Sequence, residues 1–205
     1  MEQETIIFPS SLRVIEDGAF QGRKGLKSIV VPDTVEEIGN DAFEGTSLEE
    51  IVFPRELRKL GQMNGYYFFL RKLDFSKVRH LEEFPAYFLS PDTPELKELA
   101  LPIGVKKVGE SIGGNNLKKL FLPPTVEVVD DLCLTELDIF CFSPKIETLG
   151  MMVADLRDPD EYCRLYVLPE YLEAYKAQQE AEGVSNVHLI IEEMPEEYWH
   201  YYDEK

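Results

Sequence analysis

The sequence has few basic residues, few cysteines and no long apolar run, and each shortage excludes a class of protein. It carries 21 lysine and arginine residues against 39 aspartate and glutamate residues, a net charge of −18. Nucleic acids and anionic membrane surfaces attract basic proteins, so neither is expected as a partner. No apolar stretch approaches the roughly 18 residues of a membrane-spanning helix, so membrane insertion is not expected either.

Cysteine usage and the N-terminus bear on the compartment. Cys133, Cys141 and Cys163 are an odd number without a CxxC pair, which is a poor basis for a disulfide framework or a zinc site. We expect small buried thiols, with one bridged or reactive pair as the alternative. Residues 1–5 show no signal-peptide pattern. Two expectations stay open: a cytoplasmic protein, or a secreted or cell-surface protein whose signal peptide has been removed.

Motifs that carry chemistry are also missing. The three histidines, at positions 80, 188 and 200, are isolated in sequence, and no nucleophile-elbow, HExxH, Walker A or Rossmann pattern occurs. Adjacent carboxylates such as Glu36 and Glu37 would face opposite sides of a strand, so most such pairs cannot share a substrate. We therefore expect no enzymatic activity, no cofactor and no metal site.

The sequence does contain an internal repeat. Residues 26–39 and 48–61 follow one pattern, L-x-x-L-x-L-P-x-x-V-x-x-I-G with apolar substitutions, often followed by an Ala-Phe pair such as Ala42-Phe43. The proline of the pattern, or a serine in its place, recurs every 20 to 26 residues, at Pro9, Pro32, Pro54, Ser76, Pro102, Pro123, Ser143 and near Pro169. A regular period of this length is typical of a solenoid.

Each part of the repeat has a structural interpretation. The L-x-L run before the proline alternates like a strand with one face in the core. Proline cannot donate a ladder hydrogen bond, so it ends the strand and turns the chain. The V-x-x-I segment predicts a second, shorter extended run. The glycine that follows, at positions 39, 61, 109 and 150, is expected to allow a tight turn with positive φ. Stacked units then share one continuous core.

These motifs resemble the BspA-type leucine-rich repeat family. The resemblance rests on Ile51-Val-Phe53-Pro54, on residues 35–43, and on residues 165–169 followed by a helical pattern, which is similar to the end unit of such arrays. It implies a leucine-rich repeat solenoid, α/β by convention but β-dominated, with a right-handed coil, a parallel sheet and a C-terminal helical cap. It also implies a binding scaffold with diverse ligands, often in a bacterial surface or secreted protein.

Three parts are predicted along the chain. Residues 1–167 form the repeat array of about seven rungs, 168–191 a cap of one helix and a last strand, and 192–205 an acidic aromatic tail. Pro169 suits the start of the cap helix and Gly183 the residue after its end. The charge is uneven, because residues 150–205 carry a net −10 and residues 1–149 a net −8.

Two candidate sites follow from this pattern. The first is the outward, concave face of the main strands, with Val52, Lys72, Asp74, Lys119 and Phe121 as candidate ligand contacts. The same outward rows include Ile139 and Cys141, and one of them alternates in charge through Glu50, Lys72, Glu98 and Lys119. That alternation is equally consistent with charges that only keep the stack soluble and in register.

The second candidate is the tail. Its four aromatic residues either belong to a frayed, solvated end or anchor an ordered, partner-docking segment; they are Tyr198, Trp199, Tyr201 and Tyr202. Residues 66–69, four aromatics in a row, are open in the same way between core packing and a contact surface.

The sequence thus favours a non-enzymatic, monomeric binding scaffold with a protein partner, engaged in recognition of a host or cell-surface protein. One alternative is a structural spacer of a longer surface protein. Another is a carbohydrate-binding, adhesin-like module, which would need exposed aromatic platforms, and the strand ladder offers chiefly Phe121.

Overall fold

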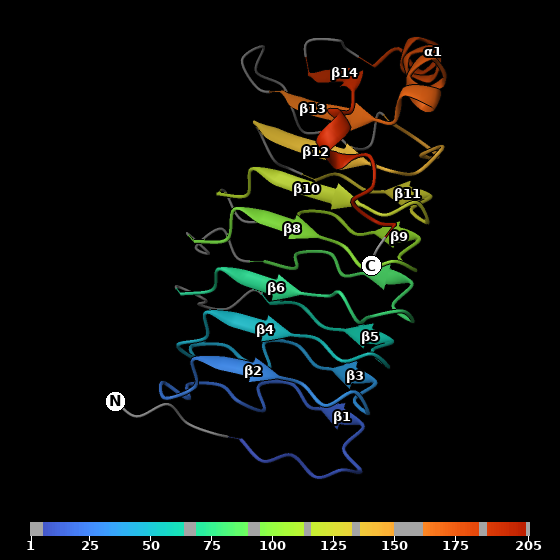
Figure 1. Ribbon diagram of the computed structural model, residues 1–205. Helices are drawn as coiled ribbons and strands as arrows, with labels where there is room; N and C mark the ends of the chain where they lie inside the picture. The colour runs from blue at the N-terminus through green and yellow to red at the C-terminus, as the bar shows by residue number, and fades with distance from the viewer. Residues whose placement is uncertain are drawn as a thin grey trace.

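Each repeat folds as one turn of a coil, because its two apolar runs are both extended and the proline between them turns the chain. The computed structural model describes residues 6–63, 69–89, 95–112, 116–132, 136–149, 162–184 and 188–203. In these residues the strands form two columns, and every pairing between neighbouring rungs is parallel (Figure 1). The chain is therefore a β-solenoid of about seven turns, as the repeat predicts.

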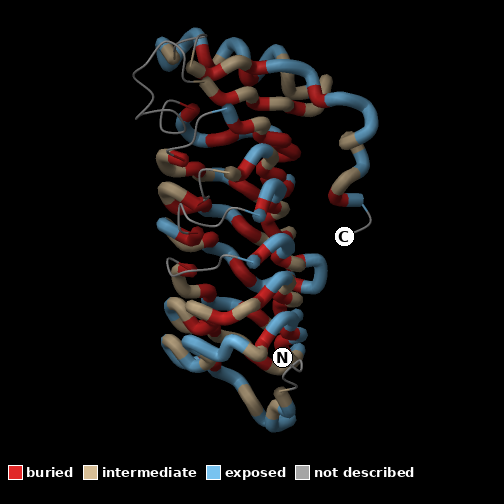
Figure 2. Tube along the Cα trace, turned by 90° about the vertical axis from the view of Figure 1, so that its left-hand side faces the viewer, coloured by how far each residue is buried: buried red, intermediate tan, exposed pale blue. Residues whose placement is uncertain are grey.

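The first column holds the longer strands and is called the main sheet below. Its strands are β2 (Ser28–Val30), β4 (Glu50–Val52), β6 (Lys72–Asp74), β8 (Glu98–Ala100), β10 (Lys119–Leu122), β12 (Leu137–Cys141), β13 (Cys163–Val167) and β14 (Leu189–Glu193). The second column consists of two-residue strands: β1 (Val14–Ile15), β3 (Glu37–Ile38), β5 (Lys59–Leu60), β7 (Glu83–Phe84), β9 (Lys107–Val108) and β11 (Val128–Val129). The core lies between the two columns (Figure 2).

The turns that follow the second column pack into the core. Ala42 and Phe43 are each 1 % exposed, and the Phe43 ring stacks on that of Phe20 one rung earlier at 5.5 Å. The glycines before these turns have a different role from the one predicted. Gly39, Gly61 and Gly109 do not adopt positive φ. They are needed because a Cβ at Gly61 would lie 2.5 Å from the backbone nitrogen of Asn40 on the preceding rung. Gly150 lies outside the described residues.

Both columns are interrupted in the middle of the stack. The main sheet consists of β2-β4-β6 and β8-β10-β12-β13-β14, and the second column of β1-β3-β5 and β7-β9-β11. No backbone hydrogen bond joins β6 to β8 in the described part of the chain. This break, called the seam below, falls in the repeat with 26 residues between its anchors, Ser76 and Pro102.

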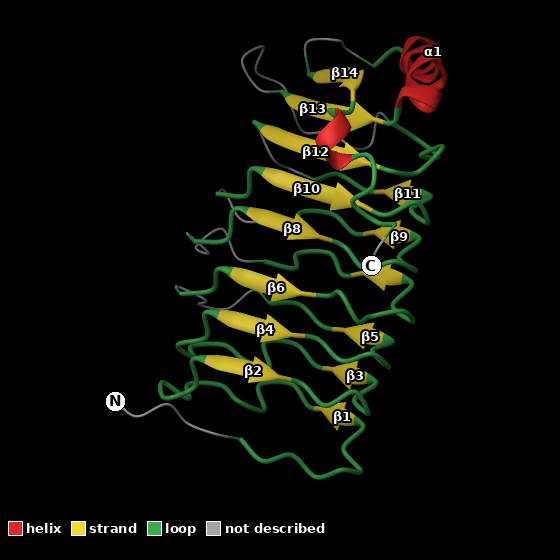
Figure 3. Cartoon of the chain, in the orientation of Figure 1, coloured by secondary structure: helices red, strands yellow, loops and turns green. Residues whose placement is uncertain are grey.

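The C-terminal end is closed by a helix. The helix α1 (Leu172–Glu182) follows a 3-10 turn, η2 (Pro169–Tyr171), and ends at Gly183, whose φ of 68° is left-handed. Tyr175 of α1 is buried and packs in the core. Gln179, also buried, donates from Nε2 to the Leu189 carbonyl of the last strand at 2.6 Å. Figure 3 shows α1 beside β13 and β14 at the end of the stack.

Residues 194–203, called the C-terminal segment below, do not continue the coil. After β14 the chain turns back and runs down one side of the stack, through a short 3-10 helix η3 (Glu196–Tyr198) (Figures 1 and 2). The division into residues 1–167, 168–191 and 192–205 remains a proposal, since β14 extends the main sheet in register with β13.

Candidate functional site

The outward row of the main sheet changes character along the stack. The strand pairings align Val30, Val52 and Asp74 before the seam and Ala100, Phe121, Phe140, Tyr166 and Glu192 after it. The row is therefore aliphatic or acidic before the seam and mainly aromatic after it. Phe121, Phe140 and Tyr166, called the aromatic stripe below, stack at ring-centroid distances of 4.8 and 5.1 Å.

The expectation that Ile139 and Cys141 face outward is wrong. Phe121 pairs with Phe140, so β12 is offset by one residue from the alignment that places Ser143 at the proline position. A shift of one residue in a strand moves every side chain to the other face. Ile139 and Cys141 are accordingly fully buried in the core, and Asp138 and Phe140 take the outward positions.

The second outward row is a ladder of alternating charge. Lys72 Nζ lies 2.6 Å from Glu50 Oε1, Lys119 Nζ lies 3.2 Å from Glu98 Oε1, and Arg164 Nη1 lies 3.5 Å from Asp138 Oδ1. Each pair joins neighbouring strands, and most of these side chains are well exposed. Exposed pairs contribute little to stability, about 0.2–1 kcal/mol each. Their main effect is to favour this register over its alternatives.

The C-terminal segment covers the aromatic stripe. The Tyr201 ring stacks on Phe121 at 4.2 Å, and the Tyr198 ring lies 4.4 Å from that of Phe140. Phe121 is left 2 % exposed and Phe140 3 %. Together with Phe142, Met194 and Tyr202 these residues form a second apolar cluster, separate from the main core.

Polar contacts fix the segment at both ends. The Tyr202 hydroxyl lies 2.8 Å from the Leu101 carbonyl and 2.9 Å from the Phe121 carbonyl, and it shares its one hydrogen between them. Lys119 Nζ donates to the Tyr198 hydroxyl at 3.1 Å and lies 5.5 Å from the centre of that ring. This hydrogen bond, with the nearby Glu98, raises the pKa of Lys119 although partial burial acts against the charge. Trp199 Nε1 donates to the Met194 carbonyl at 2.7 Å.

The two sites predicted from the sequence are thus partly one contact. Phe121 and Lys119 of the sheet meet Tyr198 and Tyr201 of the segment, and Tyr202 and Trp199 pack against the same cluster. Val52, Lys72 and Asp74 lie outside this contact. The sequence contained a signal for this contact, since both Phe121 in the outward row and the aromatic residues of the tail are large apolar groups that need burial. The sequence analysis did not pair Phe121 with the tail.

Before the seam the main sheet face is uncovered. Val30 is 62 % exposed and Val52 is half-buried, which leaves aliphatic side chains facing solvent on adjacent strands. Lys72 and Asp74 border them on the third strand. We call Val30, Val52, Lys72 and Asp74 the open strip. Of the aromatic run at residues 66–69, only Phe69 is described, and it is 51 % exposed.

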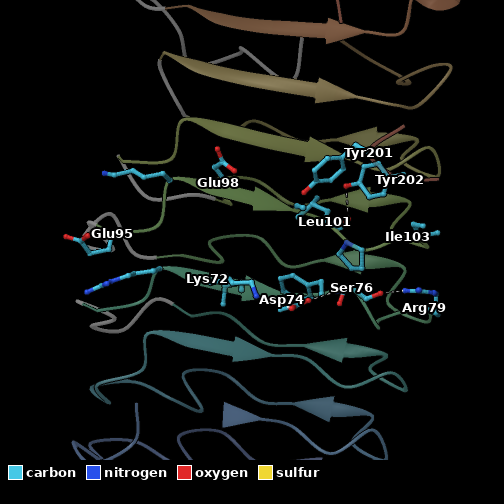
Figure 4. A pocket seen from close by; sticks show the side chains of 16 residues that line it. Lys72, Asp74, Ser76, Arg79, Glu95, Glu98, Leu101, Ile103, Tyr201 and Tyr202 are labelled. Atoms are coloured by element: carbon cyan, nitrogen blue, oxygen red, sulfur yellow. Dashed lines mark hydrogen bonds and ion pairs between the residues drawn. The ribbon is translucent and has the colours of Figure 1, made fainter. Parts of the chain in front are cut away.

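A groove of about 550 Å³ lies at the seam, next to the C-terminal segment (Figure 4). Lys72 and Asp74 of the open strip form part of its lining. Its floor includes Leu73 and Leu101, Asp74 and Glu98 line it from the two strands, and Tyr201 closes it from the segment. Leu73 is 8 % exposed, whereas Ile51 at the same position of the preceding strand is fully buried. The break in the sheet therefore leaves Leu73 slightly more exposed than its neighbour on β4, which the sequence motifs did not indicate.

The charged groups of the groove are held in place by one another. Asp74 Oδ1 accepts from the Ser76 backbone N–H at 3.0 Å, and Asp74 Oδ2 lies 3.3 Å from Lys72 Nζ. Burial alone would raise the pKa of Asp74, but the hydrogen bonds from Ser76 and Lys72 outweigh it and hold this pKa below its usual value. Hydrogen bonds to Glu50 and Asp74 raise the pKa of Lys72. Burial, Glu98 and Asp74 raise the pKa of Tyr201. These directions keep Asp74 as a carboxylate, Lys72 as an ammonium group and Tyr201 as a neutral phenol at neutral pH.

The described residues also bear on metal binding, on membrane spanning and on thiol chemistry. Across the ranges that the structure describes, no group of three or more His, Cys, Asp or Glu side chains could hold a metal ion. No helix in the same ranges is long and apolar enough to cross a membrane. Cys141 and Cys163 are buried free thiols, and burial raises the pKa of each to about 11, so neither has the environment of a reactive cysteine. Cys133 lies outside the described residues.

Comparison with known families agrees with the repeat. The BspA type leucine rich repeat region matches residues 2–118 in six copies, which is more than half of the chain. The chain belongs to the BspA-type leucine-rich repeat family. In this BspA-type chain the repeat architecture is that of a scaffold, and the repeat family is typically non-enzymatic. The search of curated proteins found no significant match.

Three solved structures are similar to this BspA-type chain. One is a leucine-rich repeat protein from Bacteroides ovatus, 18% identical over 78% of this chain and 54% of that one, with a TM-score of 0.33. Another is a leucine rich cell surface protein from Faecalibacterium prausnitzii, 16% identical over 64% and 51%, with a TM-score of 0.38. The third is the pneumococcal vaccine antigen PcpA, 18% identical over 90% and 60%, with a TM-score of 0.42. The chain thus spans 51% to 60% of the length of these proteins.

Proposed function

We propose that this chain is a non-enzymatic recognition scaffold that binds a protein partner through the open strip. One observation carries the proposal. The chain covers the aromatic half of its main sheet face with its own C-terminal segment, and leaves Val30 62 % exposed on the other half. A sheet face built only for solubility would have polar side chains at these positions.

The composition of the open strip indicates the kind of partner. Val30 and Val52 form an aliphatic centre, and Lys72 and Asp74 form a border that carries both signs of charge, with Glu50 paired to Lys72 beside it. Protein interfaces commonly combine an apolar centre with a polar rim. The complementary surface of the partner would carry an apolar side chain flanked by one acidic and one basic group.

Position-specific photo-crosslinking tests the proposal. A benzophenone side chain would replace Val30 or Val52, and, as a control, Lys59, an exposed residue of the second column. We expect the same partner to be cross-linked from positions 30 and 52 and not from position 59. Lys72→Glu should abolish that product, because it places a third negative charge between Glu50 and Asp74.

That charge reversal should lower the free energy of unfolding by only about 1 kcal/mol, because Lys72 is 59 % exposed and exposed charges on neighbouring strands interact weakly. Equal cross-linking at positions 30 and 59, or a product that survives Lys72→Glu in a protein that remains folded, would contradict the proposal. No product from position 30 or position 52 would favour a structural spacer instead.

A further inference from the structure

The groove at the seam has features that the proposed protein interface does not use, and we propose that it binds an uncharged carbohydrate. The proposal rests on four properties of the groove: backbone groups that face the seam, a gap too narrow for another strand, a lining of balanced charge, and an aromatic ring at its wall. It does not depend on the protein interface proposed above.

The first property is a set of peptide groups that face the seam. Lys72 N donates to Glu49 O at 3.1 Å and Phe53 N donates to Asp74 O at 2.9 Å, so Lys72 and Asp74 direct their peptide groups toward β4. On the other side, Leu101 N donates to Phe121 O at 3.0 Å, toward β10. Peptide groups alternate in direction along a strand, so those of Leu73, Glu98 and Ala100 point into the seam. A ligand that covers the groove would have to supply hydrogen-bonding partners to these groups, because peptide groups shielded from water need them.

The second property is the width of the seam. Cα atoms of β6 and β8 approach within 8 Å of one another. Inserting a peptide strand would need two strand spacings, about 9.6 Å, so the seam is too narrow for strand addition. A hydroxyl group is much smaller than a strand, and it both donates and accepts, which matches N–H and C=O groups set side by side. A ligand with several hydroxyl groups therefore suits the seam better than a peptide backbone does.

The third property is the balance of charge. The groove is lined by four basic side chains and three acidic ones: Arg71, Lys72, Arg79, Lys97, Asp74, Glu95 and Glu98. Asp74 and Glu98 already pair with Lys72 and Lys119. A ligand with a net charge of either sign would meet like charges here, whereas an uncharged polyol can accept from the ammonium groups and donate to the carboxylates.

The fourth property is the tyrosine at the wall. Tyr201 is partly exposed and lines the groove together with Ala100, the small residue of the outward row. Figure 4 shows Tyr201 on the same side of the groove as Leu101. Its ring offers an apolar surface for the C–H face of a sugar, and the nearby carboxylates of Asp74 and Glu98 can accept from the sugar hydroxyls. The C-terminal segment thereby supplies the aromatic platform that the strands themselves lack, because Phe121 is buried beneath it.

The test uses the full chain and a panel of uncharged oligosaccharides of glucose, mannose, galactose and N-acetylglucosamine, screened by ligand-observed NMR and followed by calorimetry. Ala100→Phe would fill the groove, and Asp74→Asn would replace a carboxylate with an isosteric amide. We expect at least one member of the panel to bind, and each variant to weaken its affinity by about tenfold or more. Val30→Glu, on the open strip, should leave the affinity unchanged.

Three results would overturn the proposal. These are no binding by any member of the panel at about 10 mM, binding that Ala100→Phe and Asp74→Asn leave intact, or binding only to sulfated or uronic acid oligosaccharides in a parallel panel. If Ala100→Phe lowers the melting temperature, Asp74→Asn together with Glu98→Gln decides the matter. Because Val30→Glu affects only the open strip, failure here is distinguishable from failure of the protein interface.

Discussion

At the scale of single residues, Tyr202 shows how a distant side chain can complete a sheet face. It is 7 % exposed, and its hydroxyl binds the carbonyls of Leu101 and Phe121, which lie 101 and 81 residues earlier in the chain. Loss of this hydroxyl would remove the donor to the Leu101 carbonyl, whereas the Phe121 carbonyl would keep the N–H of Leu101. Losing a donor to a buried carbonyl costs more than losing an exposed hydrogen bond.

Tyr202→Phe should therefore lower the free energy of unfolding by about 1–2 kcal/mol. Tyr198→Phe is the matched control, since it removes a hydroxyl from the same segment that contacts only the ammonium of Lys119 at a less buried position. We expect it to cost less than about 0.5 kcal/mol. Urea denaturation measures both, and equal costs for the two variants would contradict this account of Tyr202.

The two buried thiols should make the free energy of unfolding depend on pH in the alkaline range. Burial raises the pKa of Cys141 and of Cys163 from 9.0 to about 11. Above pH 9 the unfolded chain loses thiol protons that the folded chain retains, so the folded state binds more protons and loses stability as pH rises. Their contribution is complete below pH 9 and is lost progressively as the pH rises to about 11.

We expect the free energy of unfolding to fall between about pH 9 and 11, by at most about 1.4 kcal/mol per pH unit for each thiol. Cys163→Ala should reduce this slope while the buried tyrosines contribute equally to both proteins. The measurement is a series of urea titrations at increasing pH. A slope that Cys163→Ala leaves unchanged would show that this thiol does not titrate as its burial requires.

At the scale of the element, the rung depends on glycines for space and not for φ. The Cβ of an alanine at position 61 would lie 2.5 Å from Asn40 N and 2.6 Å from Gly39 C, which are backbone atoms of the preceding rung and cannot move independently. By contrast, a Cβ at Gly22 would meet nothing within 4 Å, although its φ of 75° is left-handed.

Gly61→Ala should thus destabilise the protein by about 2–3 kcal/mol, the cost of forcing neighbouring rungs apart. Gly22→Ala should cost only about 1 kcal/mol, the conformational penalty at a left-handed position. Thermal or urea unfolding distinguishes the two. If Gly22→Ala were the more damaging substitution, positive φ and not rung spacing would be the controlling factor.

The same scale shows what the sequence could predict. The strands, their parallel pairing and the outward positions of Val52, Lys72 and Asp74 follow from the proline-anchored pattern, because period and alternation are local properties. The outward positions of Ile139 and Cys141 were predicted wrongly. The alignment used Ser143 as the anchor, whereas β12 pairs with β10 one residue earlier than that anchor implies, and a shift of one residue reverses the two faces of a strand. The seam and the contact of Tyr201 with Phe121 could not be predicted, because both depend on the packing of segments far apart in the chain.

At the scale of the whole molecule, the main sheet face is divided into two halves. The C-terminal segment covers the aromatic stripe after the seam, and the open strip before the seam remains accessible, with the groove between them. An uncovered stripe of Phe121, Phe140 and Tyr166 would be a large exposed apolar patch, which soluble proteins rarely leave open. Covering it leaves the open strip and the groove as accessible parts of this face.

The most direct test of this division uses Trp199, the single tryptophan of the chain, which packs against the aromatic cluster from the C-terminal segment. Its fluorescence would be followed during urea unfolding, together with far-UV circular dichroism and acrylamide quenching of the native protein. If the segment covers the sheet, Trp199 is protected in the native state and its transition coincides with that of the strands. A native tryptophan that acrylamide quenches as freely as in the unfolded chain, or that does not respond when the strands unfold, would contradict the account.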